Sequence, residues 1–475
     1  MKEVYDMAEK RIAIIGAGPG GYVAAIRATQ LGAKVTVIED AEVGGTCLNR
    51  GCIPTKTLVA TTEVFEKIKE AASFGIDIDG GARINVPKVM ERQGKVISTL
   101  VKGIRGLFKA HGIELIEGRG AFVDAHTVEV TPKGGGDKVT VTADSVIIAT
   151  GSRPAEIPTF PFDHEKIISS DDAICFSAVP KRILIVGAGV IGCEFACVFK
   201  GMGAEEVTMV ELLPRCLSTE DPEISDLMAR ELKKKKIKLI TGAKIEKVTV
   251  NADGTVTSYM DGGATVVSDQ VLVSIGRALN TQGLGLDKAG VAQGKRGEVA
   301  VNEYLETNVP GVYAIGDVIG GIMLAHVASA EGLVAVENIM HGNVKKMDYR
   351  VVPAGIFTIP EIGSVGLREH EANDRGIKVK IGRFNLRGLG KAQAMNELAG
   401  MVKVLADAET DKVLGVHIMG AHATDFIHEA AVAMAMGATA RQVAETIHAH
   451  PTLAESVMEA MEDVHGMAVH VPPAK

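Results

Sequence analysis

Tryptophan is absent from this chain of 475 residues, and the aromatic residues together make up only 4% of it. Cysteine is also scarce, because six residues are too few for a disulfide scaffold in a chain of this length. No uncharged stretch reaches the roughly 20 apolar residues that a membrane-spanning helix needs. The chain start lacks signal-peptide features, since Lys10 and Arg11 lead directly into an apolar strand and a glycine turn. We therefore expect a cytoplasmic protein with no membrane partner.

Concentrated positive charge is missing as well. The formal net charge is -8, whereas binding to a phosphate backbone requires clustered Lys and Arg. The run of four lysines at 233–236 is interpreted as a solvated helix end, where cations suit the helix dipole. We expect neither a nucleic-acid partner nor a metal site. The length is typical of roughly three domains.

A repeated motif is the first positive feature. Residues 11–21 read RIAIIGAGPGG, and residues 182–192 read RILIVGAGVIG. Each is an apolar run of strand length that meets G-x-G-x-x-G and then a helical pattern. A second strand follows each copy and ends in an acid, Glu39 or Glu211, 18 or 19 residues after the last glycine. A separation of about 20 residues is typical of a dinucleotide-binding fingerprint.

The chemistry of dinucleotide binding explains these residue types. The first glycine permits a tight turn, the second lets backbone approach the pyrophosphate, and the third lets the helix pack on the strand. The helix N-terminus then faces the diphosphate with unpaired N–H groups, and the acid accepts hydrogen bonds from ribose hydroxyls. We predict two such sites, with Gly16, Gly18 and Gly21 in the first and Gly187, Gly189 and Gly192 in the second.

Later segments indicate the domain organisation. Segments 145–151, 271–277 and 312–318 read as buried strands that end in glycine turns. From Val352 onward, strand-like runs precede an Ala/Met-rich helix at about 424–436, which is α+β character. The predicted fold class is α/β, with two Rossmann-like dinucleotide-binding domains and a C-terminal α+β dimerisation domain. The predicted domains are 1–153, 154–282, a central domain at 283–350, and 351–475.

Two of the cysteines lie close together in segment 42–56, EVGGTCLNRGCIPTK. In a regular helix, Cys47 and Cys52 would have Cα atoms too far apart for an unstrained disulfide, which needs about 4.4–6.8 Å. We therefore expect an irregular helix start, with Gly51 and Pro54 enforcing the break. A helix N-terminus also stabilises a thiolate, so this pattern indicates a redox-active disulfide. The other cysteines are interpreted as buried small hydrophobic residues: Cys175, Cys193, Cys197 and Cys216.

Segment 42–56 resembles the active-site segment of the pyridine nucleotide–disulfide oxidoreductases, and within this family it is similar to the dihydrolipoamide dehydrogenase branch. The likeness spans essentially the whole chain. It includes GYVAAIRATQLG at 21–32, the second glycine motif, VYAIGDV at 312–318, MLAHVASAEG at 323–332 and HAHPTLAE at 448–455. Ile359 and the weakly charged stretch 327–330 depart from commoner forms of the family.

The resemblance implies roles for the redox pair and its surroundings. Cys47 exchanges with the substrate dithiol, whereas Cys52 lies against FAD and passes electrons to it, and FAD then reduces NAD⁺. Lys56 would lie near the reactive end of the flavin. Its expected partner is Glu194, because an unpaired buried charge is costly.

The resemblance also assigns the base and the dimer. A thiol needs a base before it can attack a disulfide, and the family places this role on His450, oriented by Glu455. The segment reaches into the active site of the other subunit, so the protein is expected to be a homodimer with isologous contacts. His448 is interpreted as structural.

The cofactor contacts follow in the same way. Glu211 favours NAD over NADP, because a carboxylate accepts from a 2′-hydroxyl and repels a 2′-phosphate; Arg215 could weaken that repulsion. The predicted FAD contacts are Gly16, Gly18, Gly21, Glu39, Lys56, Gly151, Asp317 and Ala325. The predicted NAD contacts are Gly187, Gly189, Gly192, Glu211 and Gly276.

The implied activity is reoxidation of dihydrolipoyl groups with NAD⁺. The implied partners are the lipoyl domains of 2-oxoacid dehydrogenase acyltransferases or the carrier protein of glycine cleavage, and the sequence leaves open which complex is served. Since no lipoyl-type domain precedes Met1, we expect the reductase component alone.

Other functions would share parts of these motifs. The main alternative is another NAD(P)H-dependent disulfide reductase, such as a glutathione-reductase-like enzyme, which Glu211 opposes. A mercuric reductase would carry a second cysteine pair near the C-terminus, but no cysteine follows Cys216. A soluble transhydrogenase would lack the redox pair. A non-enzymatic structural partner is a different class, and turnover of lipoamide would distinguish it.

Overall fold

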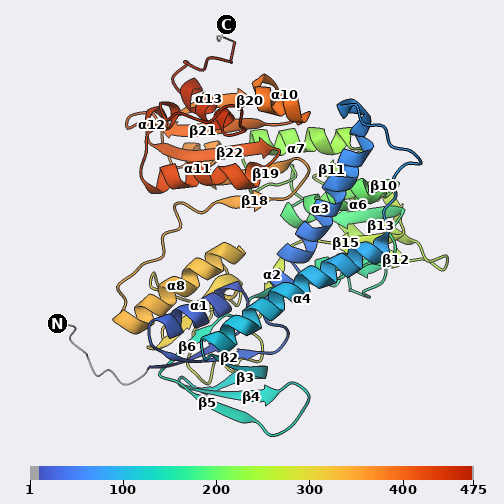
Figure 1. Cartoon of the computed structure of the whole chain (residues 1–475). Helices are drawn as coiled ribbons and strands as arrows, with labels where there is room; N and C mark the ends of the chain where they lie inside the picture. Colours follow the sequence, from blue (N-terminus) through green and yellow to red (C-terminus); the bar gives the residue numbers. More distant parts are fainter. Residues whose placement is uncertain (1–9, 473–475) are drawn as a thin grey trace. The chain divides into compact units, whose positions relative to one another are not determined.

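The computed structural model describes residues 10–472, which form two compact units (Figure 1). The first unit joins residues 10–57, 87–155 and 276–348, and the second joins 58–86, 156–275 and 349–472. The first glycine motif thus shares a unit with the predicted central segment. The second motif shares a unit with the C-terminal segment. The boundaries of the four domains drawn from the sequence stay a prediction.

The first unit is built on a seven-stranded sheet. β1 (Arg11–Ile15) is buried after its first residue and both of its neighbours run parallel to it, as expected for a sheet covered on both faces. Strand order is β17 (Val312–Ala314), β6 (Ser145–Ile148), β1, β2 (Lys34–Glu39), β3 (Glu114–Asp124), β4 (Thr127–Pro132) and β5 (Val139–Thr142). The last two strands pair antiparallel and extend the sheet as a hairpin. A small antiparallel pair joins β7 (Ser152–Pro154) to β16 (Arg277–Leu279).

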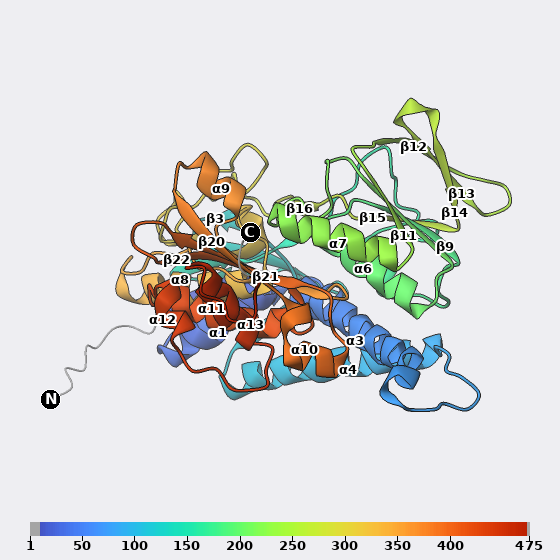
Figure 2. The same ribbon diagram turned by 90° about the horizontal axis from the view of Figure 1, so that it is seen from above.

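Helices of the first unit cover this sheet. Figures 1 and 2 show α1 (Pro19–Gln30) and α8 (Ala325–His341) side by side. The two helix backbones approach so closely that a Cβ added to Gly332 would lie 2.7 Å from the carbonyl oxygen of Gly20. The other helical segments are α2 (Gly45–Asn49), the start of α3 (Cys52–Lys69), α4 (Val86–Ala110) and η3 (Gly316–Ile319).

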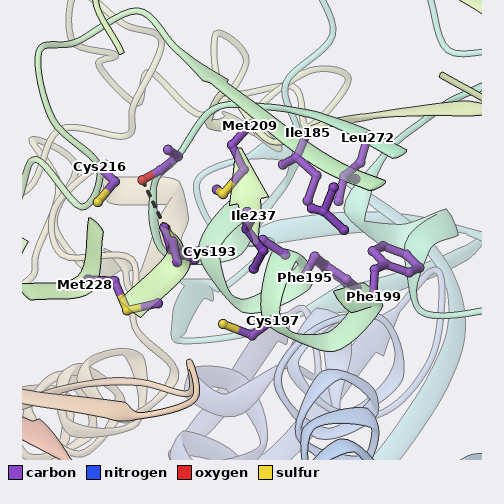
Figure 3. Close-up of a cluster of buried hydrophobic side chains, with 14 of the residues drawn as sticks. Ile185, Cys193, Phe195, Cys197, Phe199, Met209, Cys216, Met228, Ile237 and Leu272 are labelled. Atoms are coloured by element: carbon purple, nitrogen blue, oxygen red, sulfur yellow. Dashed lines mark hydrogen bonds between the residues drawn. The ribbon is translucent and has the colours of Figure 1, made fainter. Parts of the chain in front are cut away.

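The second unit contains the second parallel sheet. Its strand order is β11 (Ile237–Thr241), β10 (Glu206–Glu211), β9 (Arg182–Val186), β15 (Gln270–Val273) and β8 (Ile167–Ile168). An antiparallel sheet of β12 (Ile245–Val250), β13 (Val256–Met260) and β14 (Thr265–Ser268) follows it. The helical segments are η1 (Ala71–Phe74), α5 (Ser170–Ala173), α6 (Val190–Met202), α7 (Pro222–Lys234) and η2 (Asp261–Gly263). Figure 3 shows the apolar core in which α6 packs on the sheet.

The C-terminal part of the second unit is a five-stranded antiparallel sheet with helices, which is the α+β character predicted. The strand order is β18 (Ala354–Ile356), β19 (Glu361–Gly366), β22 (Val413–Gly420), β21 (Met401–Asp407) and β20 (Val379–Asn385). The helical segments are α9 (Glu369–Asp374), η4 (Leu386–Gly388), α10 (Gly390–Met395), α11 (Ala423–Ala435), α12 (Ala440–Ala444) and α13 (Glu455–Asp463).

The prediction that the four remaining cysteines are buried is wrong for Cys175. It is exposed, because it lies in the turn directly after the four-residue helix α5. Cys193, Cys197 and Cys216 are buried as predicted. Within residues 10–472, none of the helices combines the length and the apolar character needed to cross a membrane.

Candidate active site

The first glycine motif forms a tight loop between β1 and α1. Gly16 has φ +111°, and a Cβ there would lie 2.2 Å from the Ala149 carbonyl oxygen. A Cβ on Gly21 would lie 1.9 Å from the carbonyl oxygen of Gly16. The N-cap of α1 is Gly18, which supplies no side-chain cap. The first N–H groups of α1 therefore face outward without a side-chain acceptor, as a diphosphate requires.

The second motif repeats this geometry in the second unit. A Cβ on Gly187 would lie 2.5 Å from the Ser274 carbonyl oxygen, and a Cβ on Gly192 would lie 2.0 Å from the carbonyl oxygen of Gly187. Gly189 caps α6 without a side-chain hydrogen bond. Ser274, which the sequence did not single out, donates its hydroxyl to the Gly187 carbonyl at 3.1 Å. Both loops thus fit a dinucleotide diphosphate.

Each glycine loop donates a backbone hydrogen bond to the acid that ends the neighbouring strand. Glu39 Oε2 accepts from the Ala17 N–H at 2.6 Å, and Glu211 Oε2 accepts from the Ala188 N–H at 2.6 Å. The other oxygen of each acid accepts at 2.8 Å from the N–H two positions further along its own chain. Burial raises the pKa of Glu39, although these hydrogen bonds oppose the shift. Glu39 in the first unit and Glu211 in the second unit therefore occupy equivalent positions relative to their glycine loops.

Arg215 does not reach toward Glu211 in this arrangement. Its guanidinium donates to the carbonyl oxygens of Ser218 at 3.0 Å and Glu220 at 3.4 Å. Bound to backbone in this way, Arg215 is a poor candidate for neutralising a 2′-phosphate. The charge at the end of β10 is therefore the negative charge of the Glu211 carboxylate.

The two cysteines of segment 42–56 lie where one helix ends and the next begins. Cys47 is in the short helix α2, and Cys52 is the first residue of α3. The break falls at Arg50 and Gly51, while Pro54 is tolerated in the first turn of α3. Cys47 is half-buried and Cys52 is exposed.

The two thiols interact directly. A hydrogen bond with Cys52, followed by burial, raises the pKa of Cys47, while the charge of Lys56 opposes the shift. Two thiolates therefore do not coexist in this pair. Such proximity is also what disulfide formation requires.

The cysteine helix begins on the first glycine loop. The Gly44 N–H donates to the Ala17 carbonyl at 2.8 Å. A Cβ on Gly45 would lie only 2.7 Å from the Cα of Gly18. Asn49 closes α2 by donating its amide to the Gly45 carbonyl at 2.9 Å. The redox pair and the candidate diphosphate site are thus held by one continuous set of backbone contacts.

Lys56 and Glu194 have different surroundings. Lys56 lies in the second turn of α3, close enough to Cys47 to influence its pKa. Glu194 is buried in α6 and accepts from the Phe357 N–H at 2.9 Å. Their pairing stays a prediction.

Asp317 lies in a polar cluster of the first unit. Its Oδ2 accepts from the Ser152 hydroxyl, and the Nε of Arg277 lies 3.7 Å from the same oxygen. Arg277 Nε also donates to the Ser152 hydroxyl at 2.6 Å. The sequence reasoning missed Ser152 and Arg277. A usable signal was present, since Ser152 directly follows segment 145–151 and Arg277 is the last residue of the equivalent segment 271–277.

The remaining predicted cofactor contacts lie at helix starts and open turns. Ala325 is the first residue of α8. Gly151 and Gly276 have φ values of +69° and +130°, and an added Cβ would meet nothing within 4 Å. Their backbones therefore border open space.

His450 and Glu455 lie together at the start of α13. His450 Nδ1 lies 2.8 Å from Glu455 Oε1, and Glu455 Oε2 accepts from the Thr452 N–H at 2.8 Å. Burial acts to raise the pKa of Glu455, but these two hydrogen bonds outweigh it and lower the pKa. The imidazole is 76% exposed. The contact at Nδ1 fixes the ring and leaves Nε2 as the atom for proton transfer.

His448 has a different environment. Its side chain is only 7% exposed, with Nε2 2.5 Å from Glu429 and Nδ1 2.7 Å from the Thr446 carbonyl. Both ring nitrogens are thus engaged. Large apolar side chains are also exposed in this part of the second unit: Val432, Met436 and Ile447 are 65%, 81% and 97% exposed.

The family models match both parts of the chain. Residues 10–332 match the pyridine nucleotide-disulphide oxidoreductase model, and residues 352–461 match the dimerisation domain of the same family. The dihydrolipoyl dehydrogenase of Bacillus subtilis is 42% identical over 473 residues, covering 97% of this chain and 99% of that protein. The mitochondrial dihydrolipoyl dehydrogenase of Pisum sativum is 41% identical over 469 residues, covering 98% and 93%.

A solved structure agrees with these matches. The crystal structure of LpdA from Mycobacterium tuberculosis superposes with a TM-score of 0.89 at 28% identity, covering 95% of this chain and 99% of that one. The predicted fold class, the flavin and pyridine nucleotide chemistry and the capacity to dimerise are confirmed at the level of the family. The chain belongs to the pyridine nucleotide-disulphide oxidoreductase family.

Proposed function

We propose that the protein catalyses the dihydrolipoyl dehydrogenase reaction, in which a dihydrolipoyl dithiol is oxidised and NAD⁺ is reduced. The observation that carries the proposal is the cysteine helix α2 built on the first glycine loop, with Gly45 against Gly18. Full-length relatives that bear this activity in their names support the choice of substrate.

The two glycine loops would hold the two cofactors. The first loop, with Glu39 at the end of β2, would bind FAD, since the redox pair lies beside it. The second loop, with Glu211, would bind NAD. Bound FAD supplies the two-electron chemistry that connects a dithiol to a nicotinamide.

The protein's own residues would perform the sulfur chemistry. His450 of the partner subunit takes a proton from the substrate thiol at Nε2, and Glu455 stabilises the resulting imidazolium. The substrate thiolate attacks Cys47 Sγ, breaks its bond to Cys52 and forms a mixed disulfide. The second substrate thiol then displaces Cys47, so that the substrate leaves as a cyclic disulfide and the cysteine pair is left reduced.

The leaving sulfur has a supportive environment. Cys52 departs as a thiolate at the N-terminus of α3, where unpaired N–H groups stabilise negative charge. The ammonium of Lys56, one turn further along the helix, adds to this stabilisation. Cys47 would be the thiol that receives a proton, because its pKa is raised beside Cys52.

A homodimer would complete each site. The second subunit would cover the exposed apolar side chains of Val432, Met436 and Ile447, and it would bring its own His450 to the redox pair. Lipoyl domains of a 2-oxoacid dehydrogenase or glycine cleavage complex are the proposed partners. The cytoplasm is the proposed location, because a reducing compartment suits a chain whose other cysteines are thiols.

A steady-state comparison tests the proposal. The purified yellow protein is assayed with dihydrolipoamide and NAD⁺, with NADP⁺ in place of NAD⁺, and with glutathione disulfide and NADPH. We expect turnover mainly in the first assay, since Glu211 repels a 2′-phosphate. A preference for glutathione disulfide with NADPH would instead identify a glutathione-reductase-like enzyme and overturn the proposal.

A further inference from the structure

A second pair of thiols lies beside the second glycine loop. Cys193 is in the first turn of α6, directly after Gly192, and Cys216 is in the segment after β10. Both thiols belong to the same buried cluster, and each changes the pKa of the other: that of Cys193 is raised and that of Cys216 is lowered. Figure 3 shows both side chains in the same part of the buried cluster. Only 0% and 1% of their surfaces are exposed.

Backbone contacts connect this pair to the loop. Cys193 Sγ donates to the Ala188 carbonyl at 3.4 Å, and the Leu217 N–H donates to the same oxygen at 2.8 Å. The N–H of Ala188 donates to Glu211 at 2.6 Å. Ala188 is the middle residue of G-A-G in the motif. Any change at the two sulfur atoms therefore acts on the peptide that shapes this loop.

We propose that Cys193 and Cys216 form a second, reversible disulfide when the protein meets hydrogen peroxide, and that this bond weakens dinucleotide binding at the second loop. The effect on binding rests on the proposed assignment of NAD to that loop. The bond itself does not rest on it.

The chemistry balances with peroxide as the oxidant. One thiolate attacks the peroxide O–O bond, giving a sulfenic acid and, after protonation, water. The second thiol attacks the sulfenic sulfur, so the S–S bond forms and a second water leaves. Cys216 is the better first nucleophile, because its interaction with Cys193 lowers its pKa.

Bond formation would disturb the loop in two ways. The S–H that Cys193 donates to Ala188 disappears on oxidation. A disulfide of about 2.05 Å is also shorter than any non-bonded contact between two sulfur atoms, so the segment of Cys216 moves toward α6 and shifts the adjoining Leu217. We expect the KM for NAD⁺ to rise about fivefold, which converts to about 1 kcal/mol, the usual net contribution of one hydrogen bond. The half-reaction between dithiol and flavin should be unchanged.

The test uses the full-length holoenzyme with the Cys47–Cys52 pair oxidised. It is treated with hydrogen peroxide, alkylated with iodoacetamide in denaturant, and digested with trypsin, which cuts after Lys200 and Arg215. We expect a disulfide-linked peptide pair joining Cys193 to Cys216, lost after treatment with dithiothreitol. Recovery of both cysteines as alkylated or singly oxidised residues would overturn the proposal.

Matched variants separate the bond from its effect. Cys216→Ser should abolish the cross-link and the peroxide-dependent rise in KM. Cys197→Ser removes a buried thiol one turn further along α6, and Cys175→Ser removes the exposed one; both should keep the cross-link. If the cross-link forms while the KM for NAD⁺ stays constant, the effect on binding is overturned. The dihydrolipoamide assay with the untreated enzyme reports separately on the proposed function.

Discussion

At the scale of single residues, the proposed chemistry depends most on the contact between His450 and Glu455. We expect His450→Ala to lower kcat for dihydrolipoamide by about 10²–10⁴-fold, because the substrate thiol loses its base. Flavin content should be unaffected, since His450 lies outside the first glycine loop. Steady-state kinetics and the flavin absorbance measure the two effects.

A matched histidine provides the control. His470 makes the same type of contact, with Nδ1 2.6 Å from Glu459. His470→Ala should keep nearly normal turnover. Equal losses in the two variants would remove the base assignment from His450.

Residues whose chemistry depends on a local motif were the easiest to predict. Cys47, Cys52 and the paired acids Glu39 and Glu211 follow from spacing within a few tens of residues. Ser152, by contrast, lies 165 positions from Asp317. The local pattern marks Ser152 only as the residue after segment 145–151, and its partner depends on how the strands meet.

At the scale of elements, α1 depends on the absence of a side chain at Gly21. We expect Gly21→Ala to yield protein without flavin, because the new Cβ would lie 1.9 Å from a carbonyl oxygen and force the loop apart. Flavin absorbance of the purified variant checks this. Gly94→Ala in α4 is the control, since its Cβ meets nothing within 4 Å, and it should stabilise the protein by roughly 0.5–1 kcal/mol. A yellow, active Gly21→Ala variant would contradict the loop geometry.

A buried ionic cluster connects α7 to the C-terminal sheet. Lys403 is 1% exposed, and its ammonium lies 3.0 Å from Asp221, 2.7 Å from Glu223 and 2.6 Å from Glu369. We expect Lys403→Met to lower the free energy of unfolding by about 3–5 kcal/mol, because the buried Asp221 carboxylate loses its counter-ion. Urea unfolding measures the loss.

An exposed pair provides the comparison for Lys403. Lys138→Met breaks a surface contact with Glu129 and should cost less than about 1 kcal/mol. A similar small effect for Lys403→Met would mean that the buried cluster does not hold these elements together.

The same cluster predicts a dependence of stability on pH. The Arg383 hydrogen bond, followed by that of Lys403, lowers the pKa of Glu223 from 4.5 to about 2, against the effect of burial. A lowered carboxyl pKa stabilises the folded state above the unfolded value, and the contribution is lost as pH falls from about 4.5 through about 2. Urea midpoints of the wild type should therefore fall more steeply below pH 4.5 than those of Glu223→Gln. Parallel curves would exclude this group as a source of acid lability.

Element types were predictable where strands are buried and periodic, as in β1, β6 and β9. The sheet of β12, β13 and β14 was not anticipated. Its strands span only four to six residues, and β12 and β14 each have a single buried residue, so their pairing depends on the protein that surrounds them. The long helix α4 was also missed.

At the scale of the whole molecule, the proposed site needs two chains. Mixing inactive Cys47→Ser and His450→Ala proteins, followed by subunit exchange, should restore about a quarter of wild-type turnover, since half of the dimers are mixed and each has one intact site. Activity measured against exchange time checks this. If the mixture stayed inactive after exchange was verified, Cys47 and His450 of one chain would have to act together.

The hydrogen bonds that Glu39 accepts from Ala17 and that Glu211 accepts from Ala188 have a consequence for how the cofactors bind. Each ligand-binding turn is held by its own carboxylate even when no nucleotide contacts it. Ordering one residue costs about 1–2 kcal/mol of conformational entropy. Because these turns are already ordered, little of that cost arises on binding. Both pockets are therefore preorganised. Protein stripped of flavin should regain its yellow colour by simple association, without passing through an unfolded state.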